Sequence, residues 1–282
     1  MDVTVLVLIT FVASIVNGAL GYGFSSITVP VALLFYTNRI LNPALVLIEL
    51  VINAYVLFIN RKSIPNVCRR VAPILGGLAV GVGIGSYLLF LVQPAWIKFV
   101  TYFFLLPLIL LQAAGIRKPI RAEKVIAVPF GLGLGTLYSV TTISGPPLAL
   151  LFNNQGYPKQ DFRAALGIIR LAESSLTAVA YGFIGFYSAG SMEIIPYIVP
   201  SVILGIPLGT FLILLMDPET FRRICMAFDG LIVGFGLSRV LGELDLASPI
   251  TTYIILAIVI VVNGFLLLRF FRDRPVPQQV PP

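Results

Sequence analysis

Seven apolar segments of about 18 or more residues constrain this chain more than any other feature of its sequence, because a segment of that length is expected to cross a bilayer as a helix. Charged residues make up only 11% of the chain, against about 25% in soluble domains. The alternation of polar and apolar residues that marks a transmembrane β-barrel is absent. We therefore predict an all-α polytopic integral membrane protein. The predicted spans are about 41–59, 71–92, 95–115, 164–186, 193–215, 221–241 and 250–270.

Two further apolar runs are interrupted in nearly the same way. Residues 17–35 read NGALGYGFSSITVPVALLF, and residues 135–152 read GTLYSVTTISGPPLALLF. When residue 30 is placed over residue 147, PVALLF lies over PLALLF with five identities in six. We interpret the chain as an internal duplication in which each half has a glycine-broken helical hairpin and three spanning helices. The predicted divisions are a first repeat (1–116), a basic cytoplasmic linker (117–124), a second repeat (125–242), an extra C-terminal helix (250–270) and a disordered tail (271–282).

Basic residues divide unevenly between the loops, 15 against 3, and by the positive-inside rule the richer side faces the cytoplasm. This places the C-terminus in the cytoplasm and suggests a bacterial-type inner membrane. It also places residues 37–42 outside and residues 153–163 inside, so the two repeats are inverted in topology. Inverted repeats with interrupted helices are typical of secondary transporters. The 15 residues are Arg61, Lys62, Arg69, Arg70, Arg117, Lys118, Arg121, Lys124, Lys159, Arg163, Arg222, Arg223, Arg269, Arg272 and Arg274.

The helical arms beside each break are predicted to be short. Residues 3–17, 24–36, 125–138 and 143–153 each reach only ~20 Å at 1.5 Å per residue, against a hydrocarbon core of ~30 Å. We interpret them as re-entrant hairpins that enter from opposite faces and meet in mid-membrane. Two thin spans, or simple helix kinks, remain alternatives.

Several classes of function are disfavoured by what the sequence lacks. The chain has no histidine, so a His-ligated metal and a His proton relay are excluded, and we expect no metal and no cofactor. We find no nucleophile–base pairing and therefore expect no enzyme. Cys68 and Cys225 lie beside basic segments and are interpreted as free thiols. The net charge of +7 is assigned to the loops rather than to nucleic-acid binding.

The breaks offer hydroxyl groups, amides and helix N-termini, which together form a suitable site for an anion. Arg170 adds a cation within a span, where a charge is costly and therefore suggests a function. We expect a small anionic substrate to bind here near the midplane. The predicted substrate-binding residues are Asn17, Gly21, Tyr22, Gly23, Ser25, Ser26, Tyr138, Thr141, Thr142, Ser144, Gly145 and Arg170.

Three acidic residues at membrane depth, Glu49, Glu173 and Asp229, are predicted to serve coupling or pairing. Glu173 lies three residues after Arg170 on the same helix face, so it either forms a structural ion pair with Arg170 or tunes a substrate-facing cation. Glu49 either carries a coupling proton, because loss of water disfavours the charged carboxylate, or pairs with a cation from the other half. Both choices stay open, as do a coupling cation and a homodimeric assembly.

Glycines also recur at small-xxx-small spacing, which lets helices approach closely in lipid. These are Gly77, Gly81 and Gly85 in the first half, and Gly205 and Gly209 in the second. We predict that they pack helices together.

The chain as a whole resembles the TauE/SafE family of membrane transporters, the sulfite exporter type. The resemblance lies in VPVALLF after the first break, SGPPLALLF in the second copy, GIPLG at 205–209 and the duplicated layout, and it extends from residue 1 to about 270. Tyr22 stands where we expect a further glycine, which narrows the predicted pocket. The resemblance implies export of sulfite or organosulfonate anions by alternating access. An anion channel, a carboxylate transporter of the same architecture and a structural protein are the rival interpretations.

Overall fold

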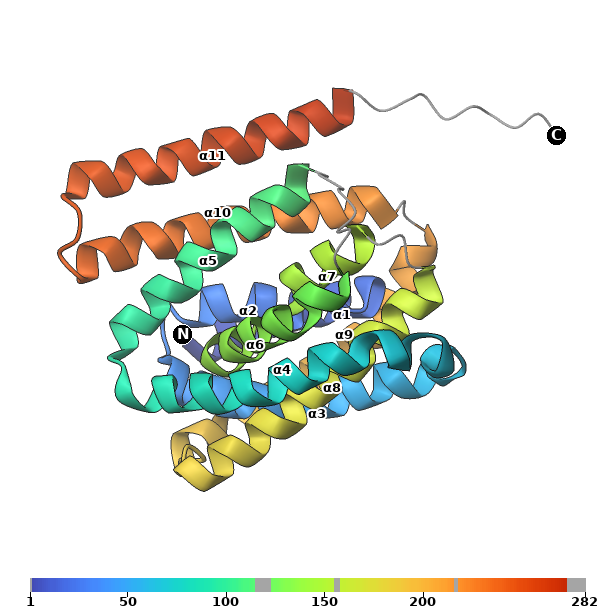
Figure 1. Ribbon diagram of the computed structural model, residues 1–282. Coiled ribbons are helices and arrows are strands. Elements are labelled where there is room, and N and C mark those ends of the chain that lie inside the picture. The colour runs from blue at the N-terminus through green and yellow to red at the C-terminus, as the bar shows by residue number, and fades with distance from the viewer. Residues whose placement is uncertain (1, 115–122, 155–157, 216–217, 273–282) are drawn as a thin grey trace.

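A computed structural model describes residues 2–114, 123–154, 158–215 and 218–272, and over these residues the chain is helical and has no strands (Figure 1). Most of the predicted linker at 117–124, and the predicted tail beyond residue 272, lie outside the described residues. The expected all-helical class is confirmed. The helices are α1 (Asp2–Leu20), α2 (Phe24–Ala32), α3 (Asn38–Ile59), η1 (Arg61–Ser63), α4 (Ile64–Leu91), α5 (Pro94–Ala114), α6 (Glu123–Thr141), α7 (Gly145–Asn154), α8 (Lys159–Ile184), α9 (Ala189–Leu215), α10 (Pro218–Glu243) and α11 (Pro249–Arg272).

Among the described residues, seven helices are long and apolar enough to cross a membrane. Six of them, α3, α4, α5, α8, α9 and α11, correspond to predicted spans. The seventh is α1, over Val3–Leu20, which we had interpreted as a short arm. The predicted span 221–241 forms part of α10, which is a long helix but is not among the seven.

α1 and α6 end later in the chain than predicted, at Leu20 and Thr141, so the predicted arms 3–17 and 125–138 are too short. α1 continues through Asn17 and Gly18 because Gly18 packs directly on the backbone of Ile206 in α9. α6 continues to Thr141 because hydroxyls bond within the helix instead of ending it, as Ser139 Oγ does to Gly135 O at 2.7 Å. Nineteen residues reach about 28 Å, close to a full crossing. The second arms are short, with nine residues in α2 and ten in α7.

The helices of the two halves pack against each other in pairs. α1 lies on α9 and α4 lies on α6, while α3 packs on α8 and α5 on α10. The short arms connect these groups, because α2 contacts α10 and α7 contacts α5. α11 packs on α10 at the edge of the molecule (Figure 1).

Glycine makes the two closest of these helix pairs possible. In the α4–α6 pair, a Cβ on Gly77 or Gly81 would overlap a backbone carbonyl oxygen of α6, and one on Gly85 would overlap Ser139 Oγ. In the α1–α9 pair, a Cβ on Gly209 would overlap Ile15 O, and one on Gly205 would crowd Ser14. The predicted packing role of the spaced glycines is confirmed.

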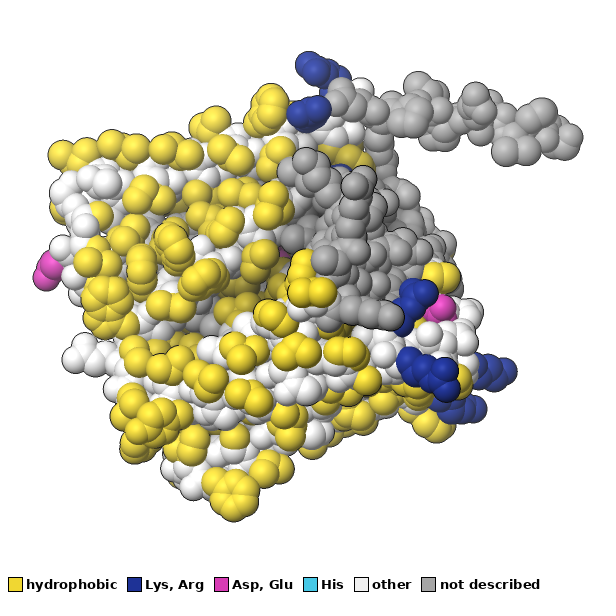
Figure 2. All heavy atoms as spheres, in the orientation of Figure 1, with side chains coloured by type: hydrophobic (Ala, Val, Ile, Leu, Met, Phe, Trp, Pro, Cys, Tyr) yellow, Lys and Arg dark blue, Asp and Glu magenta, His cyan; other side chains and the backbone are white. Residues whose placement is uncertain are grey.

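Charged and apolar side chains occupy different parts of the surface. Figure 2 shows apolar side chains over most of the visible face, and dark blue Lys and Arg side chains beside the start of α4 and at the end of α11. Asn66 Nδ2 donates to Asp161 Oδ1 at 3.3 Å, so the starts of α4 and α8 lie side by side. The basic residues of η1 and early α4 therefore lie at the same end of the molecule as the start of α8.

Candidate functional site

The first break is a three-residue turn between α1 and α2. Gly21 and Gly23 have φ angles of +82° and +109°, in a region that residues with a Cβ rarely adopt. The turn carries Tyr22 into the interior, where its side chain is buried. α2 packs back on α1 and opens with Phe24, Ser25 and Ser26, each of which has a backbone N–H. Glycine therefore lets the chain leave one helix and start the next at this point.

The second break uses a different residue type for a similar turn. Thr142 has a φ angle of +58°, which is unfavourable for a β-branched residue. Thr141 Oγ1 accepts the backbone N–H of Ile143 at 3.1 Å and holds the turn together. α7 then opens with Gly145, Pro146 and Pro147. Because proline has no N–H, this helix start has fewer free amides than that of α2.

The two breaks meet in the interior. A Cβ placed on Gly145 would lie 3.2 Å from Tyr22 Cδ2 and 3.5 Å from Ser26 Oγ. The Tyr22 ring also packs edge-on against Phe162 of α8, with ring centroids 6.4 Å apart. Residues of the two predicted breaks, which come from different halves of the chain, are therefore neighbours in space.

Glu49 of α3 is the acceptor at the centre of this region. Its Oε1 accepts Ser25 Oγ at 2.6 Å and Arg170 Nη2 at 2.7 Å, and its Oε2 accepts Tyr138 OH at 2.8 Å. The Glu49 side chain is completely buried. Three donors, one of them a cation, offset the cost of removing this carboxylate from water.

Arg170 of α8 forms its ion pair with Glu49, across the two halves. Of the two partners left open for Glu49, the structure therefore has the cation from the other half. The guanidinium also donates through Nη1 to Asn17 Oδ1 at 3.3 Å and to Gly21 O at 3.5 Å. Arg170 Nε and Asn17 Nδ2 are buried and have no hydrogen-bond partner among the described residues.

Glu173 is held by the second break rather than by Arg170. Its Oε2 accepts Ser144 Oγ at 2.5 Å, and its Oε1 has no hydrogen-bond partner among the described residues. The suggested Arg170–Glu173 ion pair is therefore not the arrangement that the described residues adopt. We refer to Glu49, Arg170, Glu173 and Tyr138, which lie within electrostatic reach of one another, as the charge cluster.

A family model described as Sulfite exporter TauE/SafE matches residues 6–237 of the chain. The chain belongs to the TauE/SafE family. The match contains both breaks and the whole charge cluster, so the family resemblance drawn from the motifs is confirmed. Membership identifies a membrane transporter of the sulfite-exporter type. No curated protein and no solved structure gives a significant match.

Not every predicted residue of this TauE/SafE protein reaches the charge cluster. Thr141 and Thr142 hydroxyls donate to the backbone carbonyls of Leu137 and Thr141, at 2.7 and 2.6 Å, and so serve the turn. Asp229 lies on α10, completely buried, and neither of its carboxylate oxygens has a hydrogen-bond partner among the described residues. None of the hydrogen bonds of the cluster involves Asp229.

Two residues beside the site were not predicted from the sequence. Asn53 Nδ2 donates to Arg170 O at 3.3 Å and so ties α3 to α8 at the cluster. Arg163 Nη2 donates to Ala19 O at 2.8 Å, and its side chain lies beside Gly21. Arg163 stands seven residues before Arg170, on the same face of one helix, and that spacing was the available indication.

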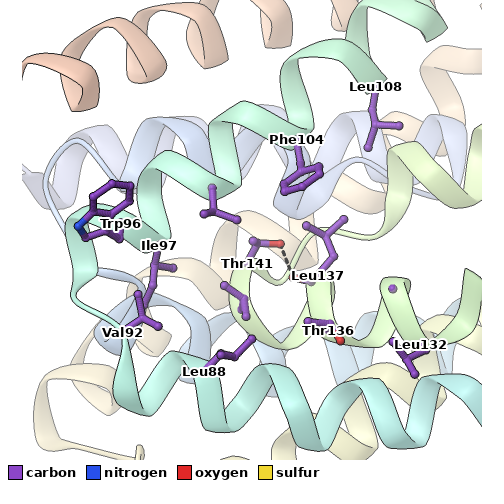
Figure 3. A pocket seen from close by; sticks show the side chains of 13 residues that line it. Leu88, Val92, Trp96, Ile97, Phe104, Leu108, Leu132, Thr136, Leu137 and Thr141 are labelled. Atoms are coloured by element: carbon purple, nitrogen blue, oxygen red, sulfur yellow. Dashed lines mark hydrogen bonds between the residues drawn. The ribbon is translucent and has the colours of Figure 1, made fainter. Parts of the chain in front are cut away.

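Two cavities are lined by residues outside the charge cluster. One of about 650 Å³ opens between α4, α5 and α6, and Figure 3 shows Trp96, Phe104 and leucine side chains pointing into it. Its polar members are Thr136 and Thr141. A second, of about 260 Å³, is lined by Lys98, Tyr102, Arg239 and Glu243. All four residues of the charge cluster are buried.

Proposed function

We propose that this protein is a secondary transporter that exports small anions, with sulfite or organosulfonates as the most suitable substrates. The observation that carries the proposal is the pair of unused donors at Arg170 Nε and Asn17 Nδ2. Both are buried beside the meeting point of the two breaks, where an oxyanion would satisfy them. Membership of the TauE/SafE family supports the same substrate class.

The first break adds donors of a second kind. The amides at the start of α2 lie at the positive end of a helix dipole, which favours an anion. Arg170 already contacts the same break through Gly21 O. A planar guanidinium can bind two oxygens of a sulfite or sulfonate group side by side. We propose that these groups bind the substrate inside the protein, where the two breaks meet.

Two inverted repeats would give this site two alternating entrances. The pairing of α1 with α9 and of α4 with α6 is what a pseudo-two-fold relation between the halves requires, and so is the pairing of α3 with α8. We propose that α1–α2 and α6–α7 are the broken hairpins of the two repeats, which enter the membrane from opposite sides. Movement of one half against the other would then expose the site alternately.

Loop charge supports the orientation that we propose. The basic residues of η1, early α4 and the end of α11 would face the cytoplasm of a bacterial-type inner membrane, together with the C-terminus. Arg39, Lys98 and Arg239 would then face outside. Export requires that the substrate reach the cluster from the side of Arg163.

The deciding experiment measures sulfite affinity of Arg170→Ala by the thermal shift of the purified protein. Loss of a hydrogen bond to a charged group costs ~1.5–3 kcal/mol, so we expect the affinity to fall by roughly 10- to 150-fold. Arg170→Lys should recover only part of the loss, because an ammonium group cannot bind two oxygens as a guanidinium does. Arg61→Ala, which changes an exposed residue in η1, is the matched control and should bind as the wild type does.

A double variant separates substrate binding from charge balance. Arg170→Ala leaves Glu49 as a buried unpaired charge, which is costly, whereas Arg170→Ala with Glu49→Gln removes both charges. If Arg170 binds the anion, the double variant folds well and still binds sulfite weakly. Wild-type affinity in the double variant would contradict the proposal and leave Arg170 as a partner for Glu49 alone.

Flux measurements in liposomes test the alternatives. A carrier exchanges labelled for unlabelled sulfite across the membrane, whereas an anion channel produces no counterflow. Competition by acetate and malonate against sulfite tests whether a carboxylate is the better substrate. A structural protein would bind none of these anions.

A further inference from the structure

The charge cluster presents an electrostatic problem for the anion site proposed above, on which this inference rests. With all three side chains ionised, Arg170 supplies one positive charge and Glu49 and Glu173 supply two negative charges. An anion that approached Arg170 Nε would meet a net negative cluster in surroundings of low dielectric constant, where like charges repel strongly. The further cation beside the first break, Arg163, lies next to Gly21 and already donates to Ala19 O. Binding therefore needs a compensating positive charge.

Glu49 is not the group that can most easily provide this compensation. Its two oxygens receive three donors, from Ser25, Tyr138 and Arg170. Each of these hydrogen bonds favours the carboxylate over the carboxylic acid. A proton on Glu49 would also break its ion pair with Arg170, at 2.7 Å.

Glu173 is held far less tightly as a carboxylate. It accepts a single hydrogen bond, from Ser144 Oγ to Oε2. Its Oε1 is buried, has no hydrogen-bond partner among the described residues and makes no ion pair there. A proton on Oε1 would disturb none of the hydrogen bonds that the cluster makes, and it would turn an unused acceptor into a donor.

The surroundings of Glu173 offer few other groups that titrate. α8 packs against α3, α4, α6, α7 and η1. From these elements, Glu49 of α3 and Tyr138 of α6 face Glu173, together with Arg170 of its own helix. The basic residues of η1 and α4 are exposed at the end of the molecule; they are Arg61, Lys62, Arg69 and Arg70.

We propose that Glu173 takes up a proton when the anion binds, so that anion and proton occupy the site together. The proton comes from water on the open side, bonds to Glu173 Oε1 and can then be donated to an oxygen of the anion. On release, the anion and the proton leave to the same side, and Glu173 returns to the carboxylate. Transfer of a monovalent anion with one proton is electrically neutral, so the membrane potential does not act on it.

Proton counting tests this coupling directly. Titration calorimetry of purified protein with sulfite, in buffers of different ionisation enthalpy, gives the protons taken up for each sulfite bound between pH 6 and pH 9. Glu173→Gln keeps an oxygen for Ser144 and carries an N–H in place of the acid proton, so it mimics protonated Glu173. Because sulfite takes up protons itself, the decisive quantity is the difference between wild type and Glu173→Gln at the same pH.

We expect that difference to rise toward one proton at the alkaline end of the range. Over that range the wild-type affinity should fall by up to tenfold per pH unit relative to Glu173→Gln. Equal proton counts throughout would overturn the coupling while leaving the anion site in place. Failure of the wild type to bind sulfite at any pH would instead contradict the proposed function itself.

A second pair of variants keeps the test decisive if Glu173→Gln does not fold. Ser144→Ala removes the donor to the Glu173 carboxylate, so the decline in sulfite affinity should move to higher pH. Thr101→Ala removes a buried hydroxyl that donates to Ile97 O within α5, outside the charge cluster, and it should leave the number of protons unchanged. A pH profile that Ser144→Ala does not move would count against Glu173 as the proton carrier.

Discussion

The two breaks are alike in sequence but differ in their turn residues and in the first residues of the helices that follow. The first turns on two glycines of positive φ and leads into a helix whose first residues, Phe24, Ser25 and Ser26, all have amide N–H groups. The second turns on Thr142 and leads into a helix in which two prolines follow Gly145. The two breaks therefore differ in the hydrogen-bonding groups that they offer.

The hydrogen bonds of the two breaks differ accordingly. Asn17 and Gly21, at the first break, accept from Arg170. Tyr138 and Ser144, at the second, donate to the carboxylates of Glu49 and Glu173. Ser25 of the first break also donates to Glu49, so both breaks hold that carboxylate, whereas the hydrogen bond to Glu173 comes from the second break. An anion needs the donors at the first break, and a coupling proton needs the carboxylate of Glu173, which the second break holds. We therefore assign substrate binding to the first break and proton coupling to the second.

The largest effect is expected from a test of whether the breaks are inverted. In a variant without Cys68 and Cys225, single cysteines are placed at Phe35, after the first hairpin, and at Gln160, after the second. Both positions are exposed. An impermeant thiol reagent should label position 35 from outside only and position 160 from inside only, an all-or-none difference. Labelling of both from one side would end the inverted-repeat proposal.

Glycine replacement should reduce sulfite transport more at the first break than at the second, a smaller but still clear difference. Gly21→Val forces a β-branched residue to a φ of +82°, at a cost of roughly 1–3 kcal/mol, and should abolish sulfite transport. Gly145→Ala crowds the Tyr22 ring, 3.2 Å from the new Cβ, and meets Ser26 Oγ at an ordinary 3.5 Å, so it should keep part of the transport activity. Flux in proteoliposomes measures both.

The matched control for these substitutions is Gly83→Val. Gly83 lies in α4, and a Cβ there would have open space around it. We expect normal flux and normal amounts of this variant in the membrane. If Gly21→Val transported as well as Gly83→Val, the first break would be a mere kink with no role in the site.

How much of this was predictable depends on whether a feature is local. Apolar length predicted six of the spans, and the spacing of Gly77, Gly81 and Gly85 predicted close packing, because each is a property of one helix. The ends of α1 and α6 were misplaced, because Gly18 and Ser139 stay helical through contacts that only the fold provides. Polarity alone did not distinguish such residues from those that end a helix.

The partners of the buried charges were the least predictable feature. Arg170 has an acidic residue three positions away, yet it pairs with Glu49, which lies 121 residues earlier in the chain. The choice follows from the packing of α3 on α8 and from Ser144, which occupies Glu173 instead. A pattern within one helix gives the candidates for a pair, while the contact between helices selects among them.

The smallest effect is expected where the two breaks differ in turn residue. Thr142→Gly gives the second break the residue type of the first, and it relieves a φ of +58° that costs on the order of 1–3 kcal/mol. Against this gain stand the backbone entropy of glycine, about 0.5–1 kcal/mol, and the lost hydroxyl bond to Thr141 O, about 0.5–1.5 kcal/mol. The terms nearly cancel, so the melting temperature should change by no more than about 4 °C, with sulfite affinity unchanged within about twofold.

Thr141→Gly is the matched control, because Thr141 is helical and has no such strain to relieve, so this change should lower the melting temperature. An equal loss of stability in both variants would mean that the Thr142 side chain stabilises the second break by more than its unfavourable φ angle costs.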